Sequence, residues 1–543
     1  MNYESSRIGE DIDPRYGSSF MAKKNAVATP NKLASMAANR ILNKGGNAID
    51  AMVTANSVLG VVFPHMTGAG GDSFWLIYDA KTGKRYSLNA TGHSGEDVTL
   101  DKFDKEEGMD IRGPKAVTTV PGAVSGWIEA HERFGKLTMK ECLEPAIEYA
   151  NEGFPVGRSL AKFSEVALTL LRTYPSTAKV FLKQGVAPYM KGDTMKNPDL
   201  GKTLELIAEH GMDAFYRGEI ADKVTEFLQQ HGGLLKKDDF ARHQATWEEP
   251  IEVQYGDRTV IAPPPNSAGM VTLQILGMMD HLDITSMKGH EEQFIDAFTR
   301  ATAFSFMDRD EFLDDPDFNK VPTDVLLSKE YFKERVQKMH DPALGPPENG
   351  YANKGDTTFS CAVDDEGNAV GVIQSLYWEW GSGVVAEGTG MMLQNRGSYF
   401  SLDSKARNKL EPNKRPAHTL TCSMVFHEDK PELIVGAMGG DGEPQTQALI
   451  IMRLLNQGYS VQEAIDAPRW LLGRTWGENV RGLRLEGRYD KQIAEKLKDL
   501  GHVNVTMIEN FSDLMGHAQA IRIWPDRIEA GADPRAGGLA IGN

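Results

Sequence analysis

Cysteine is scarce in this sequence: only Cys142, Cys361 and Cys422 occur among 543 residues, far apart and without a C-x-x-C pair. This usage indicates a reduced compartment and a chain without a disulfide framework. Basic residues are also in deficit, because 59 lysines and arginines face 76 acidic residues and give a formal net charge of −17. Phosphate binding needs a basic face, so nucleic acid is not an expected partner.

Long apolar runs are missing as well. The most apolar long window, residues 48–66, contains Asp50, Asn56 and Pro64, which excludes a membrane span. The first residues, MNYESSRIGEDIDPRYG, show no basic region followed by an apolar stretch, so no signal peptide is expected. The sequence therefore predicts a soluble cytoplasmic protein without a membrane partner.

Several common catalytic motifs do not occur. The sequence has no H-E-x-x-H, no G-x-S-x-G, no Walker P-loop and no EF-hand loop. The glycine-rich run at residues 68–72 precedes a strand instead of following one, so it does not match a dinucleotide fingerprint. We interpret it as a tight turn that packs backbone closely, with phosphate binding as the alternative. No metal and no organic cofactor are expected.

Helices and strands alternate along the chain. A helix is expected to begin at Thr29-Pro30, with Leu33, Met36, Ala37 and Ile41 on one face, and a second helix carries Ala48, Met52, Ala55 and Leu59 on one face. Strands are expected at 74–78 and 85–89, a mainly helical region at 121–243, and a helix from about Gly269. The length allows two to four domains or one large α/β unit.

Residues 341–356 hold three prolines and three glycines and are interpreted as an irregular, exposed linker. The sequence pattern changes after this linker. Thr357 to Val363 and residues 369–376 then read as strands around a turn, with further strands at 420–425 and 433–438. Gly439-Gly440-Asp441-Gly442 opens the next helix.

The bond between Asp356 and Thr357 lies where this linker becomes a strand. Threonine in a strand is ordinarily explained by β-propensity alone. A strand-borne threonine next to an exposed peptide bond can also attack that bond and become a new N-terminus. Its freed α-amine, with an ordinary pKa of about 7.7–8.0, then serves as the base for its own hydroxyl. Thr357 is therefore the candidate nucleophile.

A nucleophile of this kind needs donors for the oxyanion. The N–H groups of Gly439 and Gly440 can approach a substrate oxygen closely because glycine has no side chain, and a helix N-terminus favours negative charge. A purely structural turn is the alternative.

The sequence resembles the γ-glutamyltranspeptidase family of N-terminal nucleophile hydrolases over almost its whole length. The motifs that carry the resemblance are Val120-Pro121-Gly122, Phe215-Tyr216-Arg217-Gly218, Pro263-Pro264-Pro265, the start at Thr357, Gly381-Ser382-Gly383-Val384-Val385, Pro412-Asn413-Lys414-Arg415-Pro416, Ala467-Pro468-Arg469 and Asp533-Pro534-Arg535. It implies a four-layer αββα fold of the α+β class and a proenzyme cut into residues 1–356 and 357–543. The two pieces would remain one intertwined unit, and a homodimer of the processed unit stays possible.

By the same resemblance, Ser375 falls where the family has a second hydroxyl that supports the nucleophile. The residues that read glutamate are changed: Thr91 stands in place of an arginine, and Tyr377, Arg396 and Tyr399 occupy the positions that hold the α-amino group. His418-Thr419 replaces a serine pair. Candidate substrate-binding residues are therefore Arg396, Asn395, Tyr377, Tyr399, His418, Thr419 and Thr91. A structural ion pair for Arg396 and a core role for His418 are the alternatives.

The variant motifs around Gln394-Asn395-Arg396-Gly397 and Met438-Gly439-Gly440 are similar to a divergent branch that includes oxamate amidohydrolase proenzymes. The leading hypothesis is a self-processed amidohydrolase that transfers a small carboxylate-bearing acyl group to Thr357 and then to water. A γ-glutamyl hydrolase or transferase acting on glutathione or on related γ-glutamyl or glutaryl amides is the second hypothesis. An uncut, non-catalytic binding or scaffold protein is the third.

Overall fold

Two antiparallel seven-stranded sheets form the centre of the protein. The computed structural model describes residues 17–339, 355–473 and 482–543. The strand orders are β1-β18-β17-β13-β12-β9-β8 in one sheet and β19-β2-β10-β11-β3-β4-β7 in the other. The first sheet consists of β1 (Phe20–Ala22), β18 (Ile528–Ala532), β17 (His517–Ile523), β13 (Lys430–Met438), β12 (Cys422–His427), β9 (Arg258–Ala262) and β8 (Ile251–Tyr255). The second consists of β19 (Leu539–Gly542), β2 (Ala26–Thr29), β10 (Asp356–Val363), β11 (Ala369–Tyr377), β3 (Asp72–Asp79), β4 (Lys84–Ala90) and β7 (Thr246–Glu248).

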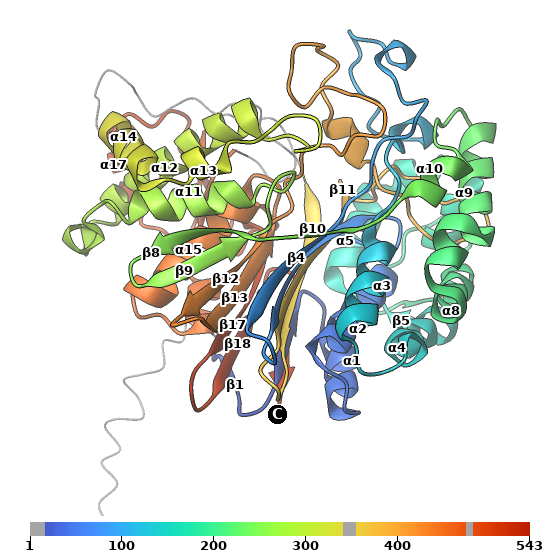
Figure 1. Cartoon of the computed structure of the whole chain (residues 1–543), viewed down its shortest axis with the longest axis horizontal. Helices are drawn as coiled ribbons and strands as arrows, with labels where there is room; N and C mark the ends of the chain where they lie inside the picture. The colour runs from blue at the N-terminus through green and yellow to red at the C-terminus, as the bar shows by residue number, and fades with distance from the viewer. Residues whose placement is uncertain (1–16, 340–354, 474–481) are drawn as a thin grey trace, which may run out of the picture.

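The sheets face each other and helices cover both outer faces (Figure 1). An apolar layer that includes Phe74, Phe359 and Ile434 fills the space between the sheets. The helices that cover the second sheet include α1 (Lys32–Asn43), α2 (Ala48–Val62), α3 (Ala123–Phe134), α4 (Met139–Glu152) and α8 (Pro198–Met212). Those on the first sheet include α11 (Gly269–Met279), α12 (Glu291–Phe312) and α15 (Gly442–Asn456). This is the expected four-layer αββα sandwich.

Strands from the two sides of residue 356 are interleaved in both sheets. In the second sheet, β10 and β11 lie between β2 and β3, which come from the N-terminal part of the chain. In the first sheet, β12 and β13 continue the chain's earlier hairpin of β8 and β9. Because each sheet needs strands from both parts, the chain forms one unit and not separate domains.

The structure contains the predicted first two helices, but their bounds or buried faces differ from the prediction. The first helix begins after Asn31, whose side chain accepts a hydrogen bond from the Leu33 N–H, whereas Thr29 lies in β2, so the predicted Thr29-Pro30 start was wrong. Met36 is 53% exposed and does not belong to the buried face. Every residue of α2 is buried, because this helix is covered on all sides and not on one.

The predicted strands at 357–363 and 369–376 correspond to β10 and β11. Most of the predicted linker, residues 340–354, lies outside the described residues. All three cysteines are buried and free. Among the residues described, no helix combines the length and apolar character that crossing a membrane requires.

The glycine-rich run packs backbone against backbone, as interpreted from the sequence. A Cβ on Gly71 would lie 2.1 Å from the carbonyl oxygen of Ser375, and one on Gly70 would lie 2.1 Å from that of Met392. Larger residues cannot fit at these two positions. The run therefore fixes the end of β11 against the start of β3.

Candidate active site

Thr357 sits at an irregularity of the β10–β11 pair. Asp356 pairs with Tyr377 and Thr358 with Gln374, so Ser375 and Leu376 together lie opposite Thr357. A bulge of this kind bends the strand and redirects the side chains beside it. Tyr377, which follows the bulge, adopts a positive φ of 82°, a conformation rare for a residue with a side chain. The backbone is thus distorted next to the candidate nucleophile.

The Thr357 hydroxyl donates a hydrogen bond to Glu443 Oε1 at 2.9 Å. Glu443 lies in the first turn of α15 and is fully buried. Burial raises the pKa of its carboxyl to about 8, although the bond from Thr357 and the charge of Arg396 act in the opposite direction. Sequence reasoning missed Glu443, because a glutamate in the first turn of a helix is ordinarily explained by the helix dipole.

Ser375 contacts the carbonyl group of the bond before Thr357. Its hydroxyl donates a short hydrogen bond to the Asp356 carbonyl oxygen. The Tyr377 N–H donates to Ser375 Oγ at 2.7 Å and orients the hydroxyl. A donor on this oxygen stabilises the negative charge that would develop there during attack on the carbonyl carbon.

Gly439 and Gly440 join β13 to α15 through backbone that suits only glycine, with φ values of 143° and 55°. The Gly440 N–H donates to the Glu443 carboxyl. Gly355, the second residue before Thr357, lies directly against this turn: a Cβ on it would be 3.1 Å from the Gly440 Cα. In the uncut chain, the segment before Thr357 therefore covers the candidate oxyanion site.

Arg396 is a buried cation that has no direct anionic partner in the part of the chain that the structure describes. Only 1% of it is exposed, and neither terminal nitrogen has a hydrogen-bond partner among the residues described. Its guanidinium lies 3.9 Å from the centre of the Tyr377 ring. Burial lowers the pKa of Arg396, against the favourable charges of Tyr377, Asp72 and Glu443. Desolvated, unsatisfied donors of this kind are costly unless something else binds them.

His418 and Asp72 lie together near Arg396. The His418 Nε2 is 3.3 Å from Asp72 Oδ2, and His418 is fully buried. Burial and the charge of Arg396 lower the pKa of His418 well below its usual value. Burial raises the pKa of Asp72 to about 6, while hydrogen bonds from Gly122 and others to the carboxylate favour ionisation. The sequence had not singled out Asp72, the last residue of the glycine-rich run.

The other predicted substrate contacts divide into two groups. Thr91 and Asn395 donate hydrogen bonds to other groups of the protein. The Thr91 hydroxyl donates to Asn89 Oδ1 at 2.7 Å, and Asn395 Nδ2 donates to the Ile111 carbonyl oxygen at 2.9 Å. Thr419 and Tyr399 remain at the site. Thr419 Oγ1 would be 3.4 Å from a Cβ on Gly355, and the Tyr399 ring lies 6.0 Å from that of Tyr377.

The Asp356 side chain is buried on the other side of the bond. Burial and the neighbouring carboxylate of Glu379 raise the pKa of Asp356 well above its usual range, against the effect of Arg112. Arg112 donates to the Glu379 carbonyl at 2.7 Å and lies 3.6 Å from its carboxylate. Sequence reasoning identified Asp356 but neither Glu379 nor Arg112.

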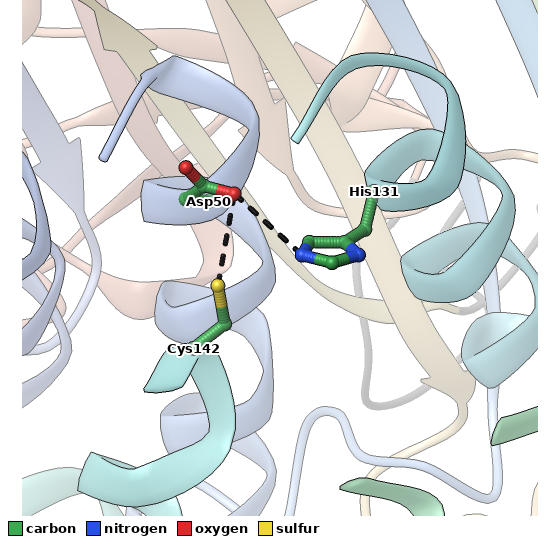
Figure 2. A group of neighbouring side chains, drawn as sticks. All are labelled: Asp50, His131 and Cys142. Atoms are coloured by element: carbon green, nitrogen blue, oxygen red, sulfur yellow. Dashed lines mark hydrogen bonds and ion pairs between the residues drawn. The ribbon is translucent and has the colours of Figure 1, made fainter. Parts of the chain in front are cut away.

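One group of side chains away from Thr357 has the composition of a metal site. Figure 2 shows Asp50 in contact with His131 and Cys142, at 3.8 Å and 3.7 Å. The Asp50 carboxylate already accepts backbone hydrogen bonds, including one from Asn47, and caps α2. His131 Nε2 is 2.7 Å from the Leu137 carbonyl oxygen, so this nitrogen carries the proton. Burial raises the pKa of the Cys142 thiol. The arrangement is that of a helix cap.

A solved cephalosporin acylase from Bacillus halodurans superimposes with a TM-score of 0.88 at 32% identity, covering 100% of this chain and 99% of that one. The chain is an enzyme of the N-terminal nucleophile amidohydrolase class.

The model of the γ-glutamyltranspeptidase family matches residues 34–543. The glutathione hydrolase-like YwrD proenzyme of Bacillus subtilis is 42% identical, over 96% of this chain and 99% of its own length. The oxamate amidohydrolase proenzyme of Klebsiella pneumoniae is 38% identical, over 97% and 99%. This chain belongs to the γ-glutamyltranspeptidase family.

Proposed function

We propose that this protein is a self-processing amidohydrolase that acts on a small amide bearing a carboxylate, such as oxamate. Thr357 is its nucleophile once the bond after Asp356 is cut, which yields pieces of residues 1–356 and 357–543. The observation that carries the substrate class is Arg396, a fully buried guanidinium whose terminal nitrogens have no partner among the described residues. A substrate carboxylate would satisfy both nitrogens at once.

The uncut chain cannot turn over a substrate in this arrangement. Thr357 and Asp356 are each 1% exposed, and Gly355 lies against Gly440. Cleavage supplies the free α-amine that serves as base and releases the segment that covers the site. The "proenzyme" in the names of both bacterial relatives supports this order of events.

In turnover, Thr357 Oγ attacks the amide carbonyl of the substrate while its own α-amine takes the hydroxyl proton. The N–H groups of Gly439 and Gly440 lie at the start of α15, where they can donate to the developing oxyanion. The amine leaves as ammonia when the substrate is a primary amide. Water then hydrolyses the acyl-threonine ester and restores the hydroxyl.

A γ-glutamyl hydrolase or transferase is the second candidate. Asp72 and Glu443 both act electrostatically on Arg396, so the site contains acids that could hold an ammonium group beside a cation that holds a carboxylate. A substrate that carries both charges, as a γ-glutamyl group does, would use the two kinds of residue. The name of the Bacillus subtilis relative supports this candidate, and the cephalosporin acylase supports a glutaryl-type variant.

Ammonia release from oxamate, compared with turnover of a γ-glutamyl anilide, separates the two candidates. We expect oxamate to be the better substrate and Arg396→Gln to lower kcat/KM for it by about 10- to 150-fold, because a charged hydrogen bond contributes about 1.5–3 kcal/mol. Arg407→Gln is a suitable control, since Arg407 is a surface residue that donates to the Lys320 carbonyl oxygen.

Three results would contradict the proposal. Strong anilide activity that Arg396→Gln abolishes would favour the γ-glutamyl candidate. Cleavage that persisted in Thr357→Ala, as judged by intact mass, would place the nucleophile elsewhere. A chain that stayed full length on incubation would refute the self-processing itself.

A further inference from the structure

Self-cleavage needs a general base other than the α-amine of Thr357, which can serve as the base during turnover. In the mature enzyme, the α-amine of Thr357 can remove the proton from its hydroxyl. In the uncut chain the same nitrogen belongs to the peptide bond with Asp356, so it has no basic lone pair. Another group must accept the proton when Thr357 Oγ attacks the carbonyl.

Glu443 is positioned to accept it. Its Oε1 receives the hydrogen bond from Thr357 Oγ1 at 2.9 Å, within the range expected for a general base and its target. Its Oε2 accepts from the Thr421 N–H at 3.2 Å, and the Gly440 N–H also donates to the carboxyl. These bonds hold the carboxyl on the first turn of α15, facing the nucleophile.

The neighbouring groups are less suited to the task. Ser375 donates its own proton to the Asp356 carbonyl oxygen and accepts from the Tyr377 N–H, so its hydroxyl is already committed. The His418 ring faces Asp72 at 3.3 Å. Of the hydrogen bonds described for the Thr357 hydroxyl, the one to Glu443 is the only one to a titratable group.

We propose that Glu443 is the general base of self-cleavage, accepting the Thr357 hydroxyl proton and returning it to the departing nitrogen. The inference rests on the proposed role of Thr357 as nucleophile.

The step balances without a further reactant except water. A bond forms between Thr357 Oγ and the Asp356 carbonyl carbon as the proton passes to Glu443, and Ser375 stabilises the oxyanion. The carbon–nitrogen bond then breaks, and the proton on Glu443 moves to the nitrogen, giving the α-amine. Water hydrolyses the resulting ester to an Asp356 carboxyl group and a free Thr357 hydroxyl.

The charges around Glu443 give the reaction a characteristic pH dependence. Burial raises the pKa of Glu443 to about 8, against the opposing effect of Arg396, and the titratable thiol of Cys422 also interacts with Glu443. A general base works only when it is deprotonated. The cleavage rate should therefore rise nearly tenfold per pH unit from pH 6 and level off above about 8.

The test follows cleavage of full-length chains made by cell-free synthesis and shifted to buffers between pH 6 and 9, with intact mass as the measurement. Glu443→Gln keeps the shape and removes the base, so we expect cleavage at pH 8 to slow by about 100-fold or more and to lose its pH dependence. Glu248→Gln is the matched control, because Glu248 is another buried carboxyl that accepts a bond from Asn89 and not from Thr357. It should cleave like the wild type.

Each outcome decides the matter. Wild-type cleavage by Glu443→Gln, with Thr357→Ala uncut, would overturn the role of Glu443 and leave the nucleophile in place. Cleavage by Thr357→Ala would instead overturn the proposed function. If a thermal melt shows that Glu443→Gln does not fold, Glu443→Asp and the wild type test the proposal instead. The cleavage rate of both should rise with pH, and a wild-type cleavage rate that does not change with pH would refute the proposal.

Discussion

A buried ion-pair network in the C-terminal part of the chain allows a quantitative prediction of stability. Asp533 Oδ2 lies 2.7 Å from Arg469 Nη2, and its Oδ1 lies 3.1 Å from Arg535 Nη1. Arg535 also contacts Glu486 at 2.7 Å. All four residues are buried, and the Ala518 N–H donates to the same Asp533 carboxylate at 2.9 Å. Two of the family motifs, Ala467-Pro468-Arg469 and Asp533-Pro534-Arg535, thus meet in one network.

Asp533→Asn should destabilise the protein by about 2–5 kcal/mol at pH 7. Burial opposes ionisation of Asp533, but Arg469 and Arg535 outweigh it and lower the pKa from 3.8 to about 2. At about 1.36 kcal/mol per pH unit, this difference corresponds to about 2.5 kcal/mol. Breaking a buried pair by removing one charge costs about 3–5 kcal/mol, because the remaining arginines lose their partner.

The sign with pH follows from the lowered pKa. The carboxylate contributes its full stability above the unfolded pKa of 3.8, and that stability is lost as the pH falls through about 2. The difference between wild type and Asp533→Asn should therefore be full at pH 7 and shrink between pH 4 and pH 2. The mutant itself should show less dependence on pH in this window.

Differential scanning calorimetry of the two proteins measures the effect. If 543 residues unfold cooperatively, the unfolding entropy is about 1.1 kcal/mol/K, so the melting temperature should fall by about 2–5 °C. Asp526→Asn is the control, because its side chain is 75% exposed and pairs with the adjacent, half-exposed Arg527, and it should shift the melting temperature by less than about 1 °C. Equal shifts for the two mutants would refute the reasoning.

Three further predictions concern the site and the thiols. Ser375→Ala removes the donor to the Asp356 carbonyl oxygen and should slow cleavage by about 100-fold or more, whereas Ser375→Thr keeps the donor hydroxyl. Intact mass followed over time measures the cleavage, and an unchanged rate in Ser375→Ala would mean that the contact is incidental. Gly440→Ala should reduce ammonia release per cleaved protein far more than Gly458→Ala. Both glycines have a positive φ, so Gly458→Ala controls for backbone strain, and a Cβ on Gly458 meets nothing within 4 Å. Similar losses in the two variants would argue against an oxyanion role for Gly440. Burial raises the pKa of each cysteine thiol, so a disulfide reagent should titrate none of Cys142, Cys361 and Cys422 in the native protein and all three after denaturation; rapid native labelling would contradict this.

Much of the architecture was predictable because it depends on local pattern and on backbone constraints. The alternation of apolar strands and helices predicted β3, β10, β11 and α11, and the motifs predicted the αββα layers. The exceptions have physical causes. Thr29-Pro30 satisfied the rules for a helix start, but Thr29 pairs with Leu539 of β19 at the end of β2, and the helix cap is Asn31. Burial of α2 on all sides depends on packing that its own sequence does not specify.

The candidate nucleophile was predictable for a similar reason. A threonine at the boundary of linker and strand, followed by a glycine pair at a helix start, is visible along the chain itself. The partners of Thr357 were not, since Glu443 is 86 residues away and meets it only because α15 begins beside β10. A glutamate in the first turn of a helix has an ordinary explanation in the helix dipole, so nothing local distinguishes it.

The residues that would select a substrate were the least predictable, because the role of a charged residue depends on which other charged residues lie next to it in the folded protein. Arg396 beside an acid would be a structural ion pair, but it has no direct anionic partner among the described residues, which is why we propose it as the site for a substrate carboxylate. Asp72 comes close enough to influence it, yet its carboxylate oxygen Oδ1 is already held by Gly92, Gly122 and Gln394. The same arginine therefore remains available although two acids lie nearby. Under the proposed function, substrate choice in this protein would depend on contacts between segments that are far apart in the sequence, while the chemistry at Thr357 would need only one bulged strand and one helix start.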